Sequence, residues 1–328
     1  MLDFSANCNP LGPSPLALEA LARVDVARYP DPTGLALRSA LAAATGLSPD
    51  RLLIGNGSVE LIWLLADVFL DAGDEALVVG PTFGEYAAAI RRAGARALEV
   101  TADERDDFRP DLAPVTEAIR GKRPRLVYLC NPNNPTGTAL DLPAIRSLLG
   151  ALGQGLLVVD EAYVDFSFGV DTALALLDDA RVVVLRSMTK SLGLAGLRLG
   201  YAAADPCVID ALGRARPPWT VNALALAAGV ASLADGGHVA SGLQVVSAAW
   251  SYLNRELGAL GVMLRPSVTS FWLGRVADPP GLRLALLRHG LQIRDCSSFG
   301  LPHHVRIAAR PLAECQRLVE VWGLLARP

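Results

Sequence analysis

The stretch from Val182 to Tyr201 reads VVVLRSMTKSLGLAGLRLGY. Its β-branched run, Val182 to Leu185, predicts a buried strand, and the glycines behind that run predict a loop. The loop carries one lysine, Lys190. A lysine beside so much apolar sequence is costly unless its amine is used, because burial disfavours the charged form. The stretch therefore predicts a strand that delivers one nucleophilic amine to a loop.

Two further residues of this stretch indicate a phosphate site. Ser187 lies shortly before Lys190 and Arg198 shortly after it. A hydroxyl and a guanidinium group hold phosphates, and an amine beside a phosphate site suggests the cofactor pyridoxal phosphate. Taken alone, this pattern is better explained by a solvated loop lysine and a surface arginine, so the rest of the chain decides between the two interpretations.

The length and composition of the chain exclude several classes of partner and site. The 328 residues leave room for two domains, and a net charge of −3 without blocks of like charge argues against nucleic-acid or membrane partners. The five cysteines lack metal-ligand spacing and resemble reduced thiols, so no metal site is expected. No basic segment followed by an apolar one opens the chain, which predicts a cytoplasmic protein. The uncharged stretch Pro217 to Ala234 is interpreted as a buried helix, not a membrane span.

Short apolar strands alternate with helical segments in the first two thirds of the chain. The predicted strands are Leu52–Ile54, Ala76–Val79, Ala97–Val100, Leu126–Leu129, Leu156–Val159 and Val182–Leu185. Such a pattern predicts an α/β fold with a mainly parallel sheet that helices cover on both faces. Ligands bind such sheets beyond the carboxyl ends of the strands.

From about Pro217 the pattern changes. One long helix is predicted from Val221 to Leu260, followed by short strands at Ser270–Leu273 and Val305–Ala308. This part predicts a smaller α+β domain to which the N-terminal arm returns. The predicted division is a large cofactor-binding domain of residues 29–216 and a small domain of residues 1–28 and 217–328.

Distinctive motifs follow the predicted strands. GNGS, Gly55 to Ser58, opens a helix whose N-terminus suits an anion. NPNNPTG contains Asn134, and DEAY runs from Asp160 to Tyr163. A carboxylate at the end of a buried strand needs a partner, which the pyridinium nitrogen of the cofactor supplies, while Tyr163 and Asn134 suit its ring hydroxyl. Each motif alone is also compatible with an ordinary turn or helix cap.

The motifs occur together and in a set order: NPLGP, RYPDPTG, GNGS, PTFGEY, NPNNPTG, DEAY and SMTKSLGLAGLRLGY, followed by Arg294 and Arg306. In this the chain resembles fold-type-I pyridoxal-phosphate enzymes of the class I/II aminotransferase superfamily, over nearly its whole length. The branch that it resembles contains histidinol-phosphate aminotransferase and threonine-phosphate decarboxylase of cobalamin synthesis.

The resemblance implies roles for individual residues. Lys190 matches the position that bonds to the cofactor as an aldimine and transfers protons. Asp160 matches the position at the pyridine nitrogen, Asn134 and Tyr163 the positions at the ring hydroxyl, and Phe83 the position that stacks on the ring.

Other matched positions concern the phosphate, the partner subunit and the substrate. The resemblance places Gly57, Ser58, Ser187 and Arg198 around the cofactor phosphate, and Tyr29 reaches that phosphate from the other subunit of a homodimer with shared active sites. For the substrate, it implies that Arg294 and Arg306 hold the anionic ends, with Asn9 and Gly12 of NPLGP as further contacts. Arginine suits carboxylate and phosphate alike.

Two reactions fit this set, and the catalytic residues do not separate them. FSANCNPLGP, PTFGEY and IRDCSSFGLPHHVRIAAR look more like the decarboxylase. The first prediction is therefore decarboxylation of L-threonine O-3-phosphate to (R)-1-aminopropan-2-yl phosphate. The alternative is histidinol-phosphate aminotransferase, a transamination with 2-oxoglutarate in histidine biosynthesis.

Two other classes of protein fit less well. A catalytically inactive pyridoxal-phosphate-binding regulator normally carries an added DNA-binding domain, for which no stretch is left over. A nucleotide-binding α/β protein needs a glycine-rich G-x-G-x-x-G turn after its first strand, which is absent. Cys8, His303 and His304 match no role. His304 could contact the substrate, but a place in a solvated loop is expected.

Overall fold

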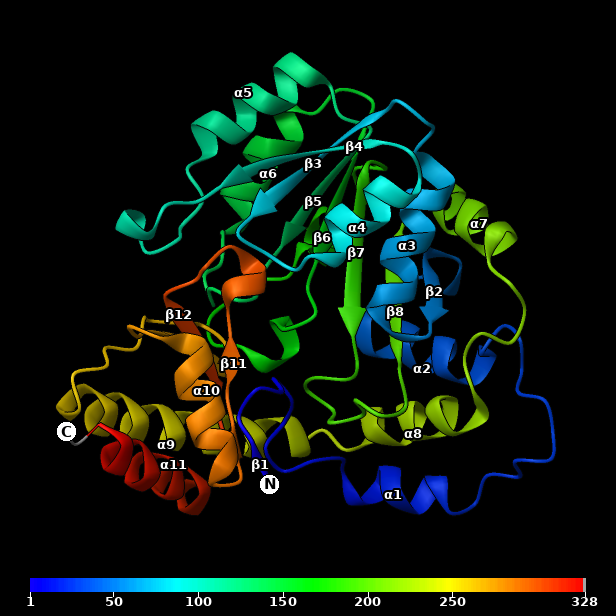
Figure 1. Cartoon of the computed structure of the whole chain (residues 1–328). Coiled ribbons are helices and arrows are strands. Elements are labelled where there is room, and N and C mark those ends of the chain that lie inside the picture. The colour runs from blue at the N-terminus through cyan, green and yellow to red at the C-terminus, as the bar shows by residue number, and fades with distance from the viewer. Residues whose placement is uncertain (327–328) are drawn as a thin grey trace.

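A computed structural model describes residues 1–326 and contains a large sheet flanked by helices, with a smaller group of helices and short strands beside it (Figure 1). The order across the large sheet is β2 (Leu52–Gly55), β8 (Gly200–Ala204), β7 (Val182–Ser187), β6 (Leu156–Asp160), β5 (Leu126–Cys130), β3 (Glu75–Gly80) and β4 (Arg96–Thr101). Strands β3 to β7 pair in parallel, so the predicted mainly parallel sheet is confirmed. Strand β8, which was not predicted, is antiparallel to β2 and β7.

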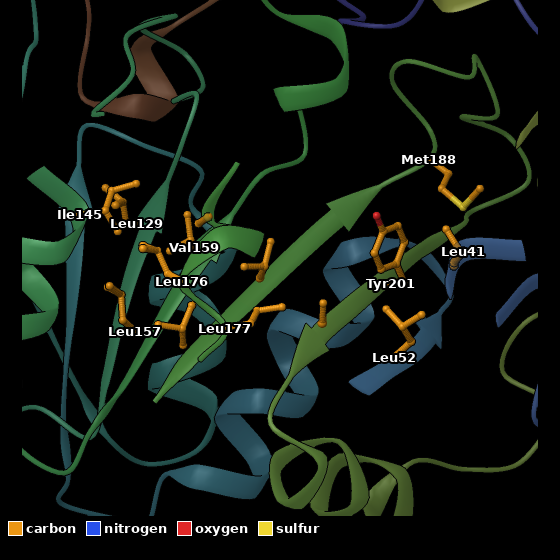
Figure 2. Close-up of a cluster of buried hydrophobic side chains, with 14 of the residues drawn as sticks. Leu41, Leu52, Leu129, Ile145, Leu157, Val159, Leu176, Leu177, Met188 and Tyr201 are labelled. Atoms are coloured by element: carbon orange, nitrogen blue, oxygen red, sulfur yellow. The ribbon is translucent and has the colours of Figure 1, made fainter. Parts of the chain in front are cut away.

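Helices cover both faces of this sheet, as predicted. One face packs against α2 (Leu35–Thr45), α5 (Leu112–Lys122), α6 (Leu142–Ala151) and α8 (Ala223–Ala234), and the other against α3 (Gly57–Phe69), α4 (Glu85–Arg92) and α7 (Pro206–Ala215). Alternate residues of each strand enter the two cores, as Val127 and Tyr128 of β5 do. Figure 2 shows part of the first core, to which Leu41, Leu52, Leu157 and Tyr201 contribute from separate elements.

The smaller part is built on two short sheets. Strands β11 (Arg294–Asp295), β12 (His304–Ala308) and β9 (Phe271–Arg275) form an antiparallel sheet. Strand β1 (Leu2–Asp3) pairs in parallel with β10 (Leu291–Gln292), which confirms that the N-terminal arm returns to this part. Residues of α9 (His238–Ala259), α10 (Pro279–Arg288) and α11 (Leu312–Leu325) form a separate core with these strands.

The single long helix predicted from Val221 to Leu260 is wrong. The structure has two helices, α8 and α9, which are bent by 80° at a break that contains Gly236 and Gly237. Within residues 1–326 no single helix is long and apolar enough to cross a membrane, and this bent pair meets the length and composition criteria only when its two helices are taken together. Helix α8 packs on the large core, and α9 packs in the small one.

Helix α1 (Pro15–Leu21) begins after Ser14, whose side chain accepts a hydrogen bond from the Ala17 amide at 3.2 Å and so caps the helix. Ala17 lies in the core of the large sheet, as do Val221 and Ala225. The proposed domain boundaries at residues 28 and 216 therefore remain a prediction about folding units, since elements on both sides of them share one core.

Candidate active site

Polar residues meet at the carboxyl edge of the large sheet, because β5, β6 and β7 are neighbours that run in parallel. Antiparallel β8 starts at the same edge and brings the preceding Arg198 there. A cavity of about 280 Å³ lies at this edge. The predicted site residues that line it are Ser58, Phe83, Asn134, Asp160, Tyr163, Ser187, Lys190, Arg198, Arg294 and Arg306. Residues far apart in the sequence therefore form one site.

Asp160 lies at the buried end of β6. Tyr86 Oη donates to its Oδ2 at 2.8 Å, and the Ala162 amide donates to its Oδ1 at 3.0 Å. Burial raises the pKa of Asp160 to about 6, although these two hydrogen bonds and the charge of Lys190 oppose the rise. A buried carboxylate with this pKa is stabilised by a cationic partner, which is what a pyridinium nitrogen provides.

Removal of this carboxylate will change how the stability of the cofactor-free protein depends on pH. Between pH 3.8 and about 6 the folded chain keeps a proton on Asp160 that the unfolded chain has lost, so stability falls as pH rises through this window. The shift corresponds to about 3 kcal/mol. We expect cofactor-free Asp160→Asn to be more stable than wild type at pH 7, and the gain to shrink towards pH 4, as measured by urea unfolding. An equal difference at both pH values would contradict the assignment.

Lys190 lies on the loop after β7, with its Nζ 5.7 Å from the centroid of the Tyr163 ring. The N-terminal arm supports this loop. The Asn9 amide donates to the Lys190 carbonyl at 2.9 Å, and Asn9 Nδ2 donates to the Ser191 carbonyl at 3.0 Å. A Cβ on Gly193 would lie 2.5 Å from the Gly12 backbone, so the arm and the loop are in close contact.

These contacts change the expectation for two residues. Asn9 and Gly12, predicted to touch the substrate, lie behind the lysine loop and are not among the residues that line the cavity. Asn9 donates to the backbone of the loop, and the Gly12 carbonyl lies 2.8 Å from His238 Nε2. Asn7, which no motif predicted, does line the cavity, and its Nδ2 donates to Tyr163 Oη at 3.3 Å.

The predicted phosphate-binding residues surround the start of α3. Gly57 has a φ of +78°, and a Cβ at this position would lie 2.9 Å from Arg198 Nη2. Any residue other than glycine would therefore push the guanidinium away from the helix N-terminus. Ser187 Oγ and Thr189 Oγ1 lie 2.7 Å apart at the same cavity. A helix N-terminus with hydroxyls and a guanidinium fits a phosphate group.

The two predicted substrate arginines face each other across neighbouring strands, since Arg294 of β11 is the register partner of Arg306 of β12. Arg306 is buried and donates from Nη2 to the Ser5 carbonyl at 2.7 Å and from Nη1 to Asn134 Oδ1. Its buried Nε has no hydrogen-bond partner among residues 1–326, and burial lowers the pKa of Arg306. Arg294 is exposed and donates to Ser298 Oγ at 2.8 Å. An anion in the cavity would supply Arg306 with a partner of opposite charge.

Tyr29 does not reach the cavity of its own chain. Its side chain is 83% exposed, and its ring lies 5.2 Å from that of Trp219, centroid to centroid. An exposed aromatic pair of this kind is compatible with the predicted contact across a subunit interface, which stays a prediction.

Other residues of the site were not predicted, because they act through contacts that a single motif does not reveal. Tyr86 belongs to the PTFGEY motif, and only its place beside Asp160 shows its role. Glu161 accepts hydrogen bonds from Arg186 Nε at 2.8 Å and Thr172 Oγ1 at 2.7 Å, which ties β7 to the segment after β6. Both side chains of this ion pair are buried, so each charge needs the other.

His304, expected in a solvated loop, is buried in β12. That expectation is wrong, because the strand begins at this residue and its side chain packs against Phe108.

Comparisons with known proteins agree with this geometry. Residues 1–321 match the sequence profile of the family aminotransferase class I and II. A histidinol-phosphate aminotransferase from Anaeromyxobacter sp. is 40% identical over 333 aligned positions, 98% of this chain and 89% of that protein. The histidinol-phosphate aminotransferase of Moorella thermoacetica is 38% identical over 94% of this chain and 81% of its own length.

Solved structures are similar over almost the whole chain. Histidinol-phosphate aminotransferase from Sinorhizobium meliloti, in complex with pyridoxal-5'-phosphate, has a TM-score of 0.91 and 28% identity, and the match covers 99% of this chain and 91% of that one. L-threonine-O-3-phosphate decarboxylase from Porphyromonas gingivalis has a TM-score of 0.86 and 26% identity, with 99% of both chains covered.

These findings support the fold-type-I prediction and its cofactor. They favour the aminotransferase over the decarboxylase that the sequence analysis placed first, because the sequence relatives carry the aminotransferase name and the decarboxylase enters through structural similarity at lower identity. With a profile match over nearly all of its length and relatives at 38% and 40% identity, the chain belongs to the class I and II aminotransferase family.

Proposed function

We propose that this protein is a pyridoxal-phosphate-dependent aminotransferase that transfers the amino group of histidinol phosphate to 2-oxoglutarate. The observation that carries the proposal is the 40% identity to a histidinol-phosphate aminotransferase over 98% of this chain. The cavity adds a lysine amine and two arginines that suit a substrate with an amine and an anionic end.

Pyridoxal 5'-phosphate is the cofactor of this site, and the residues present fit it. Ser58, Ser187 and Arg198 would hold its phosphate, Asp160 its ring nitrogen, and Tyr163 its ring hydroxyl. When bound, the cofactor supplies an electron sink for the bonds at the substrate Cα.

The residues of this chain supply orientation and proton transfer. Lys190, placed by β7 and by the contact of its loop with Asn9, accepts the Cα proton and returns it. Tyr86 and the Ala162 amide donate to Asp160 and favour its ionised form. Arg306 and Arg294 fix the anionic end, so that the Cα–H bond and not another bond faces Lys190.

The proposal includes a homodimer with shared active sites, in which Tyr29 of one subunit reaches the phosphate site of its partner. The exposed Tyr29 and Trp219 rings support this part. A cytoplasmic location is likewise part of the proposal.

A paired assay tests the reaction. We expect glutamate to form from histidinol phosphate plus 2-oxoglutarate, and no CO₂ to form from L-threonine O-3-phosphate, with Lys190→Ala as the blank. Release of CO₂ and an aminopropanol phosphate without consumption of 2-oxoglutarate would instead establish the decarboxylase, the second candidate, which the Porphyromonas gingivalis structure supports.

A further inference from the structure

An acidic turn after β4 contacts the sheet that carries the two substrate arginines. Glu104 accepts hydrogen bonds from Arg265 Nη2 at 2.8 Å and Arg275 Nη1 at 2.9 Å, and its Oε1 lies 3.3 Å from His304 Nε2. Asp107 accepts a further hydrogen bond from Arg265. The acidic residues belong to the segment between β4 and α5, and their partners flank or lie in β9 and β12. This contact therefore joins the large sheet to the small one.

The aromatic ring of Phe108 packs the same turn against the small sheet. Phe108 is buried among Leu273, Cys296 and Leu301, and its ring lies 5.6 Å from His304 in an edge-to-face arrangement. Its φ is +57°, a conformation that is costly for a residue with a bulky side chain. The packing of the Phe108 ring against the small sheet offsets this cost, so the conformation of the turn depends on its contact with the sheet.

The contact lies next to the anion-binding residues. His304 and Arg306 are two positions apart in β12, so their side chains share one face of the strand. Arg294 is the register partner of Arg306. Lys190, in contrast, follows a strand of the large sheet. The position of both arginines relative to Lys190 therefore depends on how the small sheet is held against the large one.

We propose that Glu104 is a positioning residue. It holds the sheet that bears Arg294 and Arg306 at a fixed position relative to Lys190, so that the anionic end of the substrate and its amine are bound at the same time. This inference rests on the proposed aminotransferase function.

The contact is stronger than an ordinary surface ion pair. Such pairs contribute little because solvent screens them, but the Glu104 and Arg265 side chains are only 30% and 26% exposed. Burial alone would raise the pKa of Glu104, but the hydrogen bonds from Arg275 and Arg265 and the charges of His304 and Arg275 outweigh burial and lower this pKa. Burial lowers the pKa of His304 despite the carboxylate. The charge pairing thus comes mainly from the two arginines.

Glu104→Gln tests the proposal, because it removes the charge and keeps the shape. Asp106→Asn is the matched control, since Asp106 lies in the same turn, is exposed, and forms no ion pair in the described structure. In Glu104→Gln holoenzyme we expect KM for histidinol phosphate to rise about tenfold with kcat within about twofold of wild type. Asp106→Asn should match wild type in both. Glu104→Asp should recover part of the loss.

A measurement that needs no catalytic turnover tests the positioning role of Glu104 independently of the proposed reaction. Hydrogen exchange in substrate-free holoenzyme should be faster for the amides of β9 and β12 in Glu104→Gln, and unchanged in Asp106→Asn. A wild-type protein inactive on histidinol phosphate would reject the proposed function, and the exchange data would still report on the contact. Unchanged KM and unchanged exchange in Glu104→Gln would overturn the positioning role, as would a loss confined to kcat. If Glu104→Gln does not fold, the exposed Arg275→Gln should show the same changes at smaller size.

Discussion

Replacement of Lys190 by alanine will reduce the proposed transamination about 10⁴-fold or more, because the chain then lacks the amine proposed both to bond to the cofactor and to move the Cα proton. Within the described part of the chain, no other lysine lines the cavity. A bound pyridoxal group absorbs at about 410–430 nm, and we expect this absorbance of the wild-type holoenzyme to be absent in the variant.

The sequence offers a clean control, since it contains only two lysines, Lys122 and Lys190. Lys122→Ala, at the end of α5 and remote from the cavity residues, should keep full activity. Borohydride reduction of wild-type holoenzyme followed by peptide mass spectrometry should find the cofactor on the peptide that contains Lys190. Cofactor found only on Lys122, or an active Lys190→Ala, would refute the assignment.

Arg306→Ala will lower kcat/KM for histidinol phosphate by about 10²–10³-fold, mainly through KM, because a buried guanidinium that binds an anion makes charge-assisted hydrogen bonds. The effect on unphosphorylated histidinol should be much smaller. The Arg306 side chain also donates to the Ser5 carbonyl and to Asn134. Part of the loss in kcat/KM will therefore come from the N-terminal arm, which loses its hydrogen bond to Arg306. Steady-state kinetics with both substrates measure the difference.

Two further variants make this result interpretable. Arg306→Lys keeps the charge but loses the planar guanidinium, and should recover only a fraction of the affinity. Arg317→Ala removes an exposed arginine of α11 that pairs with Glu320 and should change neither substrate's KM. Equal increases in KM for phosphorylated and unphosphorylated substrate would exclude contact between Arg306 and the phosphate.

Much of the site was predictable because its residues follow parallel strands. Asn134, Asp160 and Lys190 lie at or after the ends of three neighbouring strands, whose carboxyl ends share one edge of the sheet, so their motifs alone place them together. Partners that reach the site from elsewhere could not be found this way. Tyr86 projects from a helix and Asn7 from the N-terminal arm, and no local pattern shows that they meet Asp160 and Tyr163.

The errors have physical causes as well. Strand β8 reads GYAAA, and alanine carries little strand preference, so it was overlooked. The break between α8 and α9 lies at two glycines inside an apolar region, where helical periodicity continues on both sides. The residues around Lys190 could not decide between decarboxylase and aminotransferase, because both reactions fit the same residues and differ in the orientation of the substrate.

The pairing of β1 with β10 also constrains how the protein matures on the ribosome. Leu2 is made long before its register partner Leu291, and the Ala308 amide donates to the Phe4 carbonyl at 2.8 Å. The N-terminal arm cannot form this pairing until residues 291 and 292 have been synthesised. Since the same arm supports the lysine loop through Asn9, a ribosome-bound nascent chain that ends before residue 291 should be unable to complete the catalytic centre, however well its large sheet has already folded.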